Sequence, residues 1–156
     1  MPETKERPRL TRNPDDCMGE IRSEMRLENA DDRAVFERGY IDESEIRVVE
    51  IEGVVDTGAQ PGLVLPKSVM GRLGVQTRRE ERTRFADAHS AVVTVVGPIN
   101  VTIEERTTVV DAFVLPEESD PLIGQIVLER LDLRADCARQ RLVVPPESPD
   151  RPVLQL

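Results

Sequence analysis

Residues 54 to 59 read Val54-Val55-Asp56-Thr57-Gly58-Ala59 and form the most informative motif in this chain of 156 residues. Two β-branched residues precede the carboxylate, and because such residues favour strands, Asp56 is expected at the end of a buried strand. Gly58 permits the dihedral angles of a tight turn. Thr57 offers a hydroxyl that can bond to another backbone. The motif therefore predicts an acidic side chain held rigidly at the mouth of a sheet.

Such a carboxylate becomes catalytic when a second one stands beside it. Two carboxylates within about 3 Å cannot both ionise, so they share one proton and act as general base and general acid on a bound water. Asp-Thr-Gly occurs once in the sequence, so a second carboxylate of this kind requires a second copy of the chain across a twofold axis. The competing interpretation is an ordinary turn, because Asp and Gly are common turn residues.

The sequence around the motif predicts a mostly β domain with short helices. Alternating apolar and polar residues over 21–27 predict a half-buried strand. β-branched runs predict further strands, and Gly97-Pro98 is expected to turn the chain between two of them. The expected strands cover residues 46–55, 91–96, 99–103 and 107–115, and residues 63–65 form a short apolar run.

The remaining segments are predicted from residues that start or stop helices and from the spacing of apolar residues. A brief helix is expected after Pro66, with Ser68 as its N-cap and Gly74 as its C-terminal stop. An apolar stripe predicts a second helix over residues 125–131. Residues 29–42 are expected to form a loop, and Leu133 with 142–144 a closing hairpin.

Taken in order, these elements resemble the retropepsin-like, or retroviral-type, aspartic peptidase family, in particular its bacterial soluble members. The motif at Asp56 is followed by Leu65-Pro66, a strand-rich stretch, and Leu122-Ile123-Gly124 before a helix. The resemblance runs over about residues 45–144. It implies a closed retropepsin-like acid protease barrel with one or two short helices.

The resemblance also implies roles for individual residues. Asp56, Thr57 and Gly58 match the catalytic triplet, with the Thr57 hydroxyl bonding across the dimer axis, and Ala59 lies in the turn beneath the substrate. A flap that closes over bound peptide is implied at Phe85–Ser90. Its expected substrate-binding residues are Ala86, Asp87, Ala88 and His89. The apolar-apolar-glycine element Leu122-Ile123-Gly124 is expected to pack under the catalytic loop.

Two departures from the family pattern bear on activity. Gln60 stands where the family has Thr, Ser or Asp, and its loop continues into Pro61-Gly62. Ala88 stands at the flap tip where glycine is common, and it lacks the positive-φ freedom of glycine. The main expectation is an aspartic endopeptidase that works as a homodimer on peptide or protein substrates. The alternatives are a non-catalytic dimeric peptide-binding module of the same fold and a small β-barrel interaction module.

Composition limits the partners and the location. The net charge of −9 makes a nucleic acid an unlikely partner because a phosphate backbone requires clustered Lys and Arg. No stretch approaches the ~20 apolar residues of a membrane span, and we expect a cytoplasmic protein without membrane contact. Residues 1–17 are expected to be a disordered leader, 18–144 the protease domain, and 145–156 a tail that is a candidate strand of a dimer interface.

Other reactive residues carry weaker signals. His89 is the only histidine and no G-x-S-x-G is present, so it is read as a flap residue that either touches substrate or is solvated. Cys17 and Cys137 lack a C-x-x-C spacing, which favours a structural thiol at Cys137 and a reducing compartment. The acidic pairs lack the ligand spacing of a calcium loop. No metal or cofactor is therefore expected.

Overall fold

The computed structural model describes residues 19–59, 61–84, 87–115 and 119–154. The strands in this part of the chain are β1 (Arg22–Asn29), β2 (Val48–Val55), β3 (Leu63–Pro66), β4 (Gln76–Arg84), β5 (Ser90–Ile103), β6 (Arg106–Leu115), β7 (Leu122–Ile123), β8 (Arg134–Asp136) and β9 (Arg141–Val143). The helices are α1 (Ala30–Glu37), α2 (Lys67–Leu73) and α3 (Gln125–Leu131), with a 3₁₀ turn, η1, at Glu43–Glu45.

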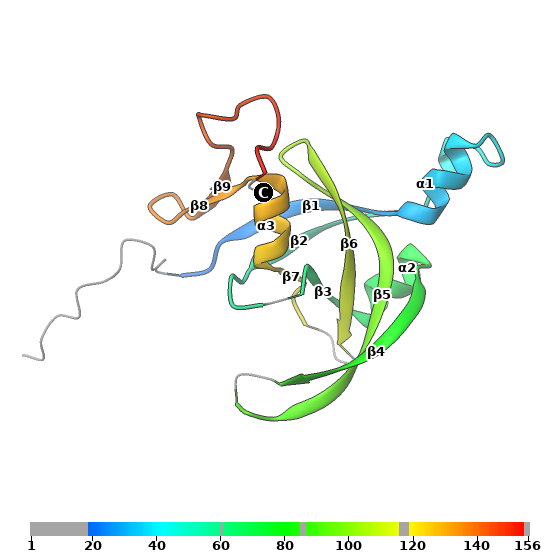
Figure 1. Cartoon of the computed structure of the whole chain (residues 1–156), viewed down its shortest axis with the longest axis horizontal. Coiled ribbons are helices and arrows are strands. Elements are labelled where there is room, and N and C mark those ends of the chain that lie inside the picture. Colours follow the sequence, from blue (N-terminus) through cyan, green and yellow to red (C-terminus); the bar gives the residue numbers. More distant parts are fainter. Residues whose placement is uncertain (1–18, 60, 85–86, 116–118, 155–156) are drawn as a thin grey trace, which may run out of the picture.

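The main sheet closes on itself into a ring. Its strand order is β1-β2-β7-β3-β6-β5-β4, and β1 also pairs with β5 through Arg26–Asn29. β4 is attached to the outside of β5, where it forms a long hairpin that projects from the ring (Figure 1). The mostly β protease fold predicted from the sequence is confirmed, with three short α-helices in place of one or two.

Apolar side chains from the alternating positions of the strands fill the ring. The completely buried residues include Leu27, Leu63, Leu65, Val101 and Ile123, which lie on β1, β3, β5 and β7. Burial of such side chains removes apolar surface from water, which is the main favourable term in folding. The ring is thus a packed core that holds the ends of its strands in fixed positions.

The strands β2, β7 and β3 determine where the motif lies. β7 runs parallel to β2, with Val54 opposite Leu122, and antiparallel to β3, with Leu63 opposite Ile123. β7 therefore separates two strands that are consecutive in the sequence. The connection from β2 to β3, residues 56–62, has to cross over the end of β7, and this crossing contains Asp56.

The expected loop at 29–42 is wrong, because α1 occupies most of it. The Asn29 side chain caps the helix by accepting a hydrogen bond of 3.0 Å from the Asp32 backbone nitrogen. Asp31 and Asp32 lie in the first turn, where negative charge is favourable beside the helix dipole. The sequence contains these capping residues, but the segment has too short an apolar pattern to indicate a helix.

Two other expectations need correction, and one strand was not expected. Gly97-Pro98 does not turn the chain: β5 continues through it, and its register with β6 shifts between Val96 and Ile99. α2 begins at Lys67 without a side-chain cap, so Ser68 is not its N-cap, whereas Gly74 ends the helix at a φ of 61° as predicted. The charged strand β4 has no apolar alternation and was not predicted.

The C-terminal part packs back onto the ring. α3 and the β8–β9 hairpin form where a helix and a closing hairpin were predicted. Buried Arg106 donates hydrogen bonds to the carbonyl oxygens of Leu131, Asp132 and Ser148. The Ser148 hydroxyl and the Val153 backbone nitrogen both donate to the Asp132 carboxylate. These bonds tie the segment after β9 to the end of α3.

Two further observations concern cysteine and membranes. Cys137 is disulfide-bonded, so the expectation of a structural thiol is wrong, and the inference of a reducing compartment loses that support. The other cysteine of the sequence, Cys17, lies outside the described residues.

Of the helices in the described ranges, none combines the length and apolar character that crossing a membrane requires.

Candidate active site

Asp56 is the first residue after β2, and the backbone holds it from two sides. Its backbone nitrogen donates to the carbonyl oxygen of Ile123 on β7 at 3.0 Å, and its own carbonyl oxygen accepts from Ala59 at 3.1 Å. Side-chain Oδ1 accepts a hydrogen bond of 3.0 Å from the Gly58 backbone nitrogen. Oδ2 has no hydrogen-bond partner among the described residues. The half-buried carboxylate therefore has a fixed position and one unoccupied oxygen.

Gly124 lies directly beneath the loop that carries Asp56. Its backbone nitrogen donates to the carbonyl oxygen of Gly62 at 3.0 Å. A Cβ atom on Gly124 would stand 2.0 Å from the Pro61 carbonyl oxygen and 2.8 Å from that of Ala59. Only glycine lets the start of α3 approach the loop this closely. The element Leu122-Ile123-Gly124 thus contacts the loop through both backbone hydrogen bonds and packing.

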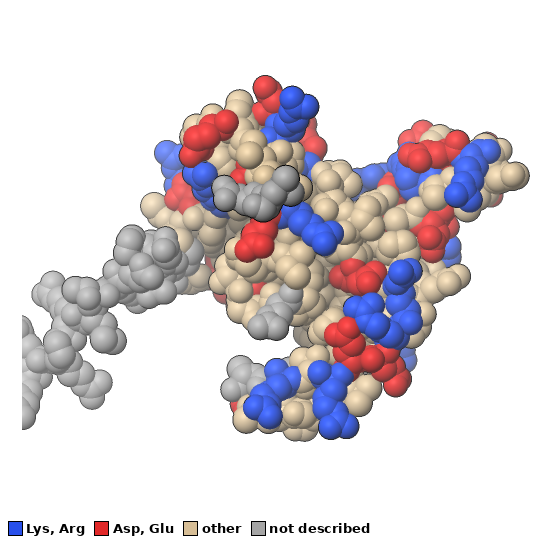
Figure 2. Space-filling view, viewed as in Figure 1, with Lys and Arg blue, Asp and Glu red and all other residues tan. Residues whose placement is uncertain are grey.

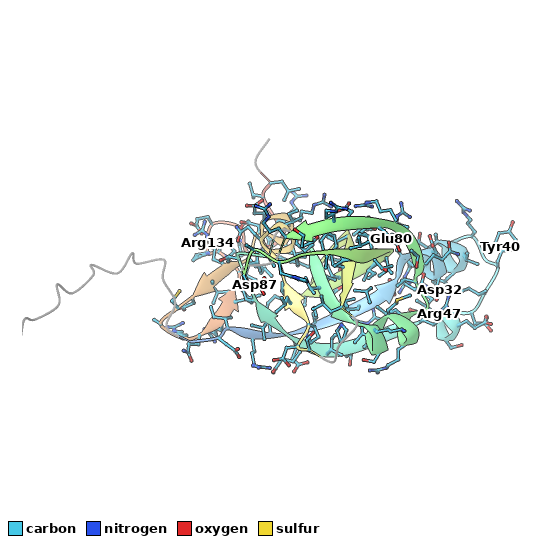
Figure 3. The ribbon with its side chains drawn as sticks, turned by 90° about the horizontal axis from the view of Figure 1, so that it is seen from below. Asp32, Tyr40, Arg47, Glu80, Asp87 and Arg134 are labelled. Atoms are coloured by element: carbon cyan, nitrogen blue, oxygen red, sulfur yellow. The ribbon has the colours of Figure 1, made fainter. Side chains whose placement is uncertain are left out.

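The flap was expected at residues 85–90, and the described residues of this range lie at the tip of the β4–β5 hairpin. In Figure 1 its tip and the loop after β2 lie toward the same end of the molecule, and Figure 3 marks the tip with Asp87. Asp87 accepts a hydrogen bond of 2.9 Å from the His89 backbone nitrogen, and Ala88 adopts a φ of 66°. Asp87, Ala88 and His89 are exposed, whereas Ala86 lies outside the described residues.

A family model for aspartyl proteases matches residues 39–127, which is more than half of the chain. The chain belongs to the aspartyl protease family. The match contains the loop at Asp56 and Leu122-Ile123-Gly124, on which the sequence resemblance was based, and the β4–β5 hairpin, where that resemblance implied a flap. A search of curated proteins found no significant match.

The aspartyl protease domain brings only some of the expected site residues together within one chain. Asp56, Gly58 and Ala59 share one turn, and Leu122-Ile123-Gly124 supports it. Thr57 is exposed, and its hydroxyl has no hydrogen-bond partner within the described ranges. Each chain supplies one Asp-Thr-Gly triplet. Within the described part of the protease domain, no cluster of three or more His, Cys, Asp or Glu side chains could hold a metal ion.

Two contributors to the protease loop were missed from the sequence. The carbonyl oxygens of Pro61 and Gly62 meet Gly124. A Cβ on Gly62 would lie 3.1 Å from Val110 on β6, so this glycine also allows close approach to the sheet. The Pro61-Gly62 pair was visible as a turn signal, but its contacts depend on the position of β7.

Proposed function

We propose that the chain is an aspartic endopeptidase that hydrolyses peptide bonds as a symmetric homodimer. The supporting observation is the single Asp56, held by backbone hydrogen bonds at the end of β2 with Oδ2 unoccupied. A twofold axis is the simplest way to bring two identical carboxylates face to face.

In the proposed reaction, the two Asp56 residues hold one proton between them. The ionised carboxylate removes a proton from a water that attacks the scissile carbonyl carbon, and the protonated carboxyl donates to the developing oxyanion or to the leaving amine. No covalent enzyme intermediate forms. Thr57 bonds across the axis, while Gly58 and Ala59 form the floor beneath the peptide. The flap residues Ala86, Asp87, Ala88 and His89 close over the peptide and exclude water.

The deciding experiment is digestion of a mixed peptide library followed by mass spectrometry. Wild type is expected to cleave, and Asp56→Asn is expected to lose at least about 10²-fold in turnover, because an amide can neither accept nor relay the proton. Asp150→Asn, an exposed residue of the C-terminal segment, is the matched control and should cleave like wild type. Wild-type turnover by purified, folded Asp56→Asn would reject this mechanism.

The second candidate is a dimeric peptide-binding module without turnover. Gln60 favours it because a hydroxyl or carboxylate expected in the active-site loop is absent. A peptide analogue with a hydroxyl in place of the scissile carbonyl separates the two. An endopeptidase should bind it ~10²-fold or more tightly than a matched substrate, as transition-state analogues do, whereas a simple peptide binder should not. A monomer in solution that binds no peptide would instead favour an interaction module.

A further inference from the structure

β4 is the outermost strand of the sheet. Among the described residues its only strand partner is β5, which pairs with it from Gln76 to Arg84. The other edge of β4 therefore presents unpaired backbone N–H and C=O groups. Such an edge can add an extended peptide as a further strand.

Two cations near the flap end of this edge are uncompensated. Arg82 and Arg84 are both exposed and, within the described ranges, neither has an ion-pair or hydrogen-bond partner. By contrast, Arg79 is 2.6 Å from Glu81 and 3.3 Å from Asp111. Figure 2 shows the basic side chains gathered over the lower hairpin, on a chain whose net charge is −9.

The two arginines also point to one face. Side chains alternate along a strand, so Arg82 and Arg84 share a face with their cross-strand partners Val92 and Ser90. Val92 is 60% exposed, so this face is open to solvent beside the free edge. Val93 and Val95, on the opposite face, are buried. A peptide strand added to β4 would place alternate side chains beside the two arginines.

We propose that the edge of β4 at Arg82 and Arg84 selects acidic peptides, that is, extended substrates with Asp or Glu at two alternating positions. This inference rests on the proposed function and names its substrate class. Opposite charges on adjacent strands favour pairing, and two such pairs should improve kcat/KM for Glu over Gln by about 3- to 10-fold.

A second copy of the chain is a poorer occupant of this edge. The acidic residues of β4, Glu80 and Glu81, are adjacent and do not alternate, so in an antiparallel pair of β4 strands Arg82 and Arg84 cannot both lie opposite a glutamate. In the registers that place Arg82 opposite a glutamate, Arg84 lies opposite another arginine. Like charges directly opposite on neighbouring strands are destabilising. An acidic peptide meets no such repulsion at Arg82 and Arg84.

The test uses short peptide pools that differ only at two alternating positions, fixed as Glu, Gln or Lys. Wild type should prefer the Glu pool, the double variant Arg82→Gln/Arg84→Gln should lose the preference, and Arg82→Glu/Arg84→Glu should prefer Lys. About 0.5 M salt should weaken the preference, because exposed charges are screened. Arg38→Gln, an exposed arginine after α1, is the control and should behave as wild type. Absence of a Glu preference, or its survival in the double variants, would overturn the proposal.

A binding measurement separates this inference from the proposed function. Fluorescein-labelled Glu and Gln pools are titrated with full-length Asp56→Asn protein, with and without the arginine substitutions. Arginine-dependent Glu preference in binding without any turnover by wild type would support the inference and reject the peptidase. Turnover by wild type without any charge preference would support the peptidase and reject the inference. The arginine substitutions could instead change only the oligomeric state, measured by sedimentation. That result would show that a second copy of the chain occupies the edge of β4, and it would overturn the proposal of an acidic peptide.

Discussion

At the scale of single residues, Gly124 makes the most demanding contact. Gly124→Ala and Gly124→Val must displace the carbonyl oxygens of Pro61 and Ala59, so each should destabilise the fold by about 1–3 kcal/mol, and Val more than Ala. Peptidase activity should fall as well, since the same loop positions Asp56. Denaturant unfolding and peptide hydrolysis measure the two effects.

Gly71 provides the matched control. A Cβ there meets nothing within 4 Å, and the residue lies in α2, where alanine is the better helix former. Gly71→Ala should therefore leave stability unchanged or raise it by up to about 1 kcal/mol. Equal effects at Gly71 and Gly124 would show that close packing under the loop is not the cause.

Ala88, at the tip of the β4–β5 hairpin, has a backbone conformation that costs free energy. Its φ of 66° lies in the left-handed region, which costs a residue with a Cβ about 1–2 kcal/mol. Ala88→Gly removes this cost but adds chain entropy to the unfolded state, so we expect a net stabilisation of up to about 1 kcal/mol. Slower amide exchange in β4 and β5 near the tip would report it. Ala91→Gly, within β5, should act in the opposite direction, and faster exchange at the tip in Ala88→Gly would contradict the argument.

At the scale of elements, two ion pairs anchor α1 to its neighbours, and these two pairs are called the anchor below. Glu28, only 5% exposed at the end of β1, accepts hydrogen bonds from Arg33 on α1 at 2.6 Å and from Asn100 on β5 at 2.9 Å. Asp32 and Arg47 form a second, two-pronged pair at 2.8 and 2.9 Å, and Figure 3 labels both at the base of the helix. The insertion between β1 and β2 is thus anchored from both ends.

Removing the charge of Glu28 should loosen this element. Glu28→Gln leaves Arg33 without its partner, which should lower the free energy of unfolding by about 1–3 kcal/mol. Chemical denaturation measures the loss. Glu24→Gln, an exposed position on β1, is the control and should change stability by less than about 0.5 kcal/mol. Equal losses at the two positions would contradict the anchor.

The same anchor predicts a pH dependence. The Arg47 hydrogen bonds hold the pKa of Asp32 below its usual range. Burial acts to raise the pKa of Glu28, but the hydrogen bonds from Arg33 and Asn100 outweigh burial and the pKa is lowered. A lowered folded-state pKa stabilises the fold above the ordinary carboxyl pKa, and this contribution is lost as the pH falls through the folded-state value.

Wild type should therefore lose stability as the pH falls below about 4. Asp32→Asn should have a shallower slope in this window, because one of the titrating groups is absent. Unfolding free energies measured at several pH values in the two proteins test the difference. Identical slopes would show that Asp32 does not contribute.

At the scale of the whole molecule, the proposed site requires two chains. Specific activity should fall on dilution through the dimer dissociation constant, as mass action requires. Activity assays paired with analytical ultracentrifugation over the same concentrations test this. Constant activity per chain at concentrations where only monomer sediments would exclude a shared site.

Mixing subunits tests the same assembly independently. When wild type and Asp56→Asn are exchanged at equal concentration, random pairing leaves about one quarter of the dimers with two aspartates. The mixed dimers should be nearly inert, since the amide cannot donate the proton that the leaving amine needs. Activity should therefore fall to about half of that expected from the amount of wild-type chain. Activity that simply tracks the wild-type chain would contradict the shared dyad.

Local signals in the sequence determined much of this protein. Apolar alternation predicted β1, and β-branched runs predicted β2, β5 and β6. Gly74 and the apolar stripe over 125–131 predicted helix boundaries that the structure contains. The turn at Asp56 and the small residue at Gly124 were also visible. These features depend on backbone preferences and on periods of a few residues, which a sequence displays directly.

Only the tertiary structure decided which of these elements meet. The insertion of β7 between β2 and β3, and the closure of the ring by β1 and β5, join segments far apart in the chain. β4 was not predicted because an edge strand on the surface needs no apolar alternation. β5 continues through Gly97-Pro98 because its pairing with β6 shifts register there. The physical reason is that pairing partners are selected by the total area and hydrogen bonding of the closed sheet, which no local pattern encodes.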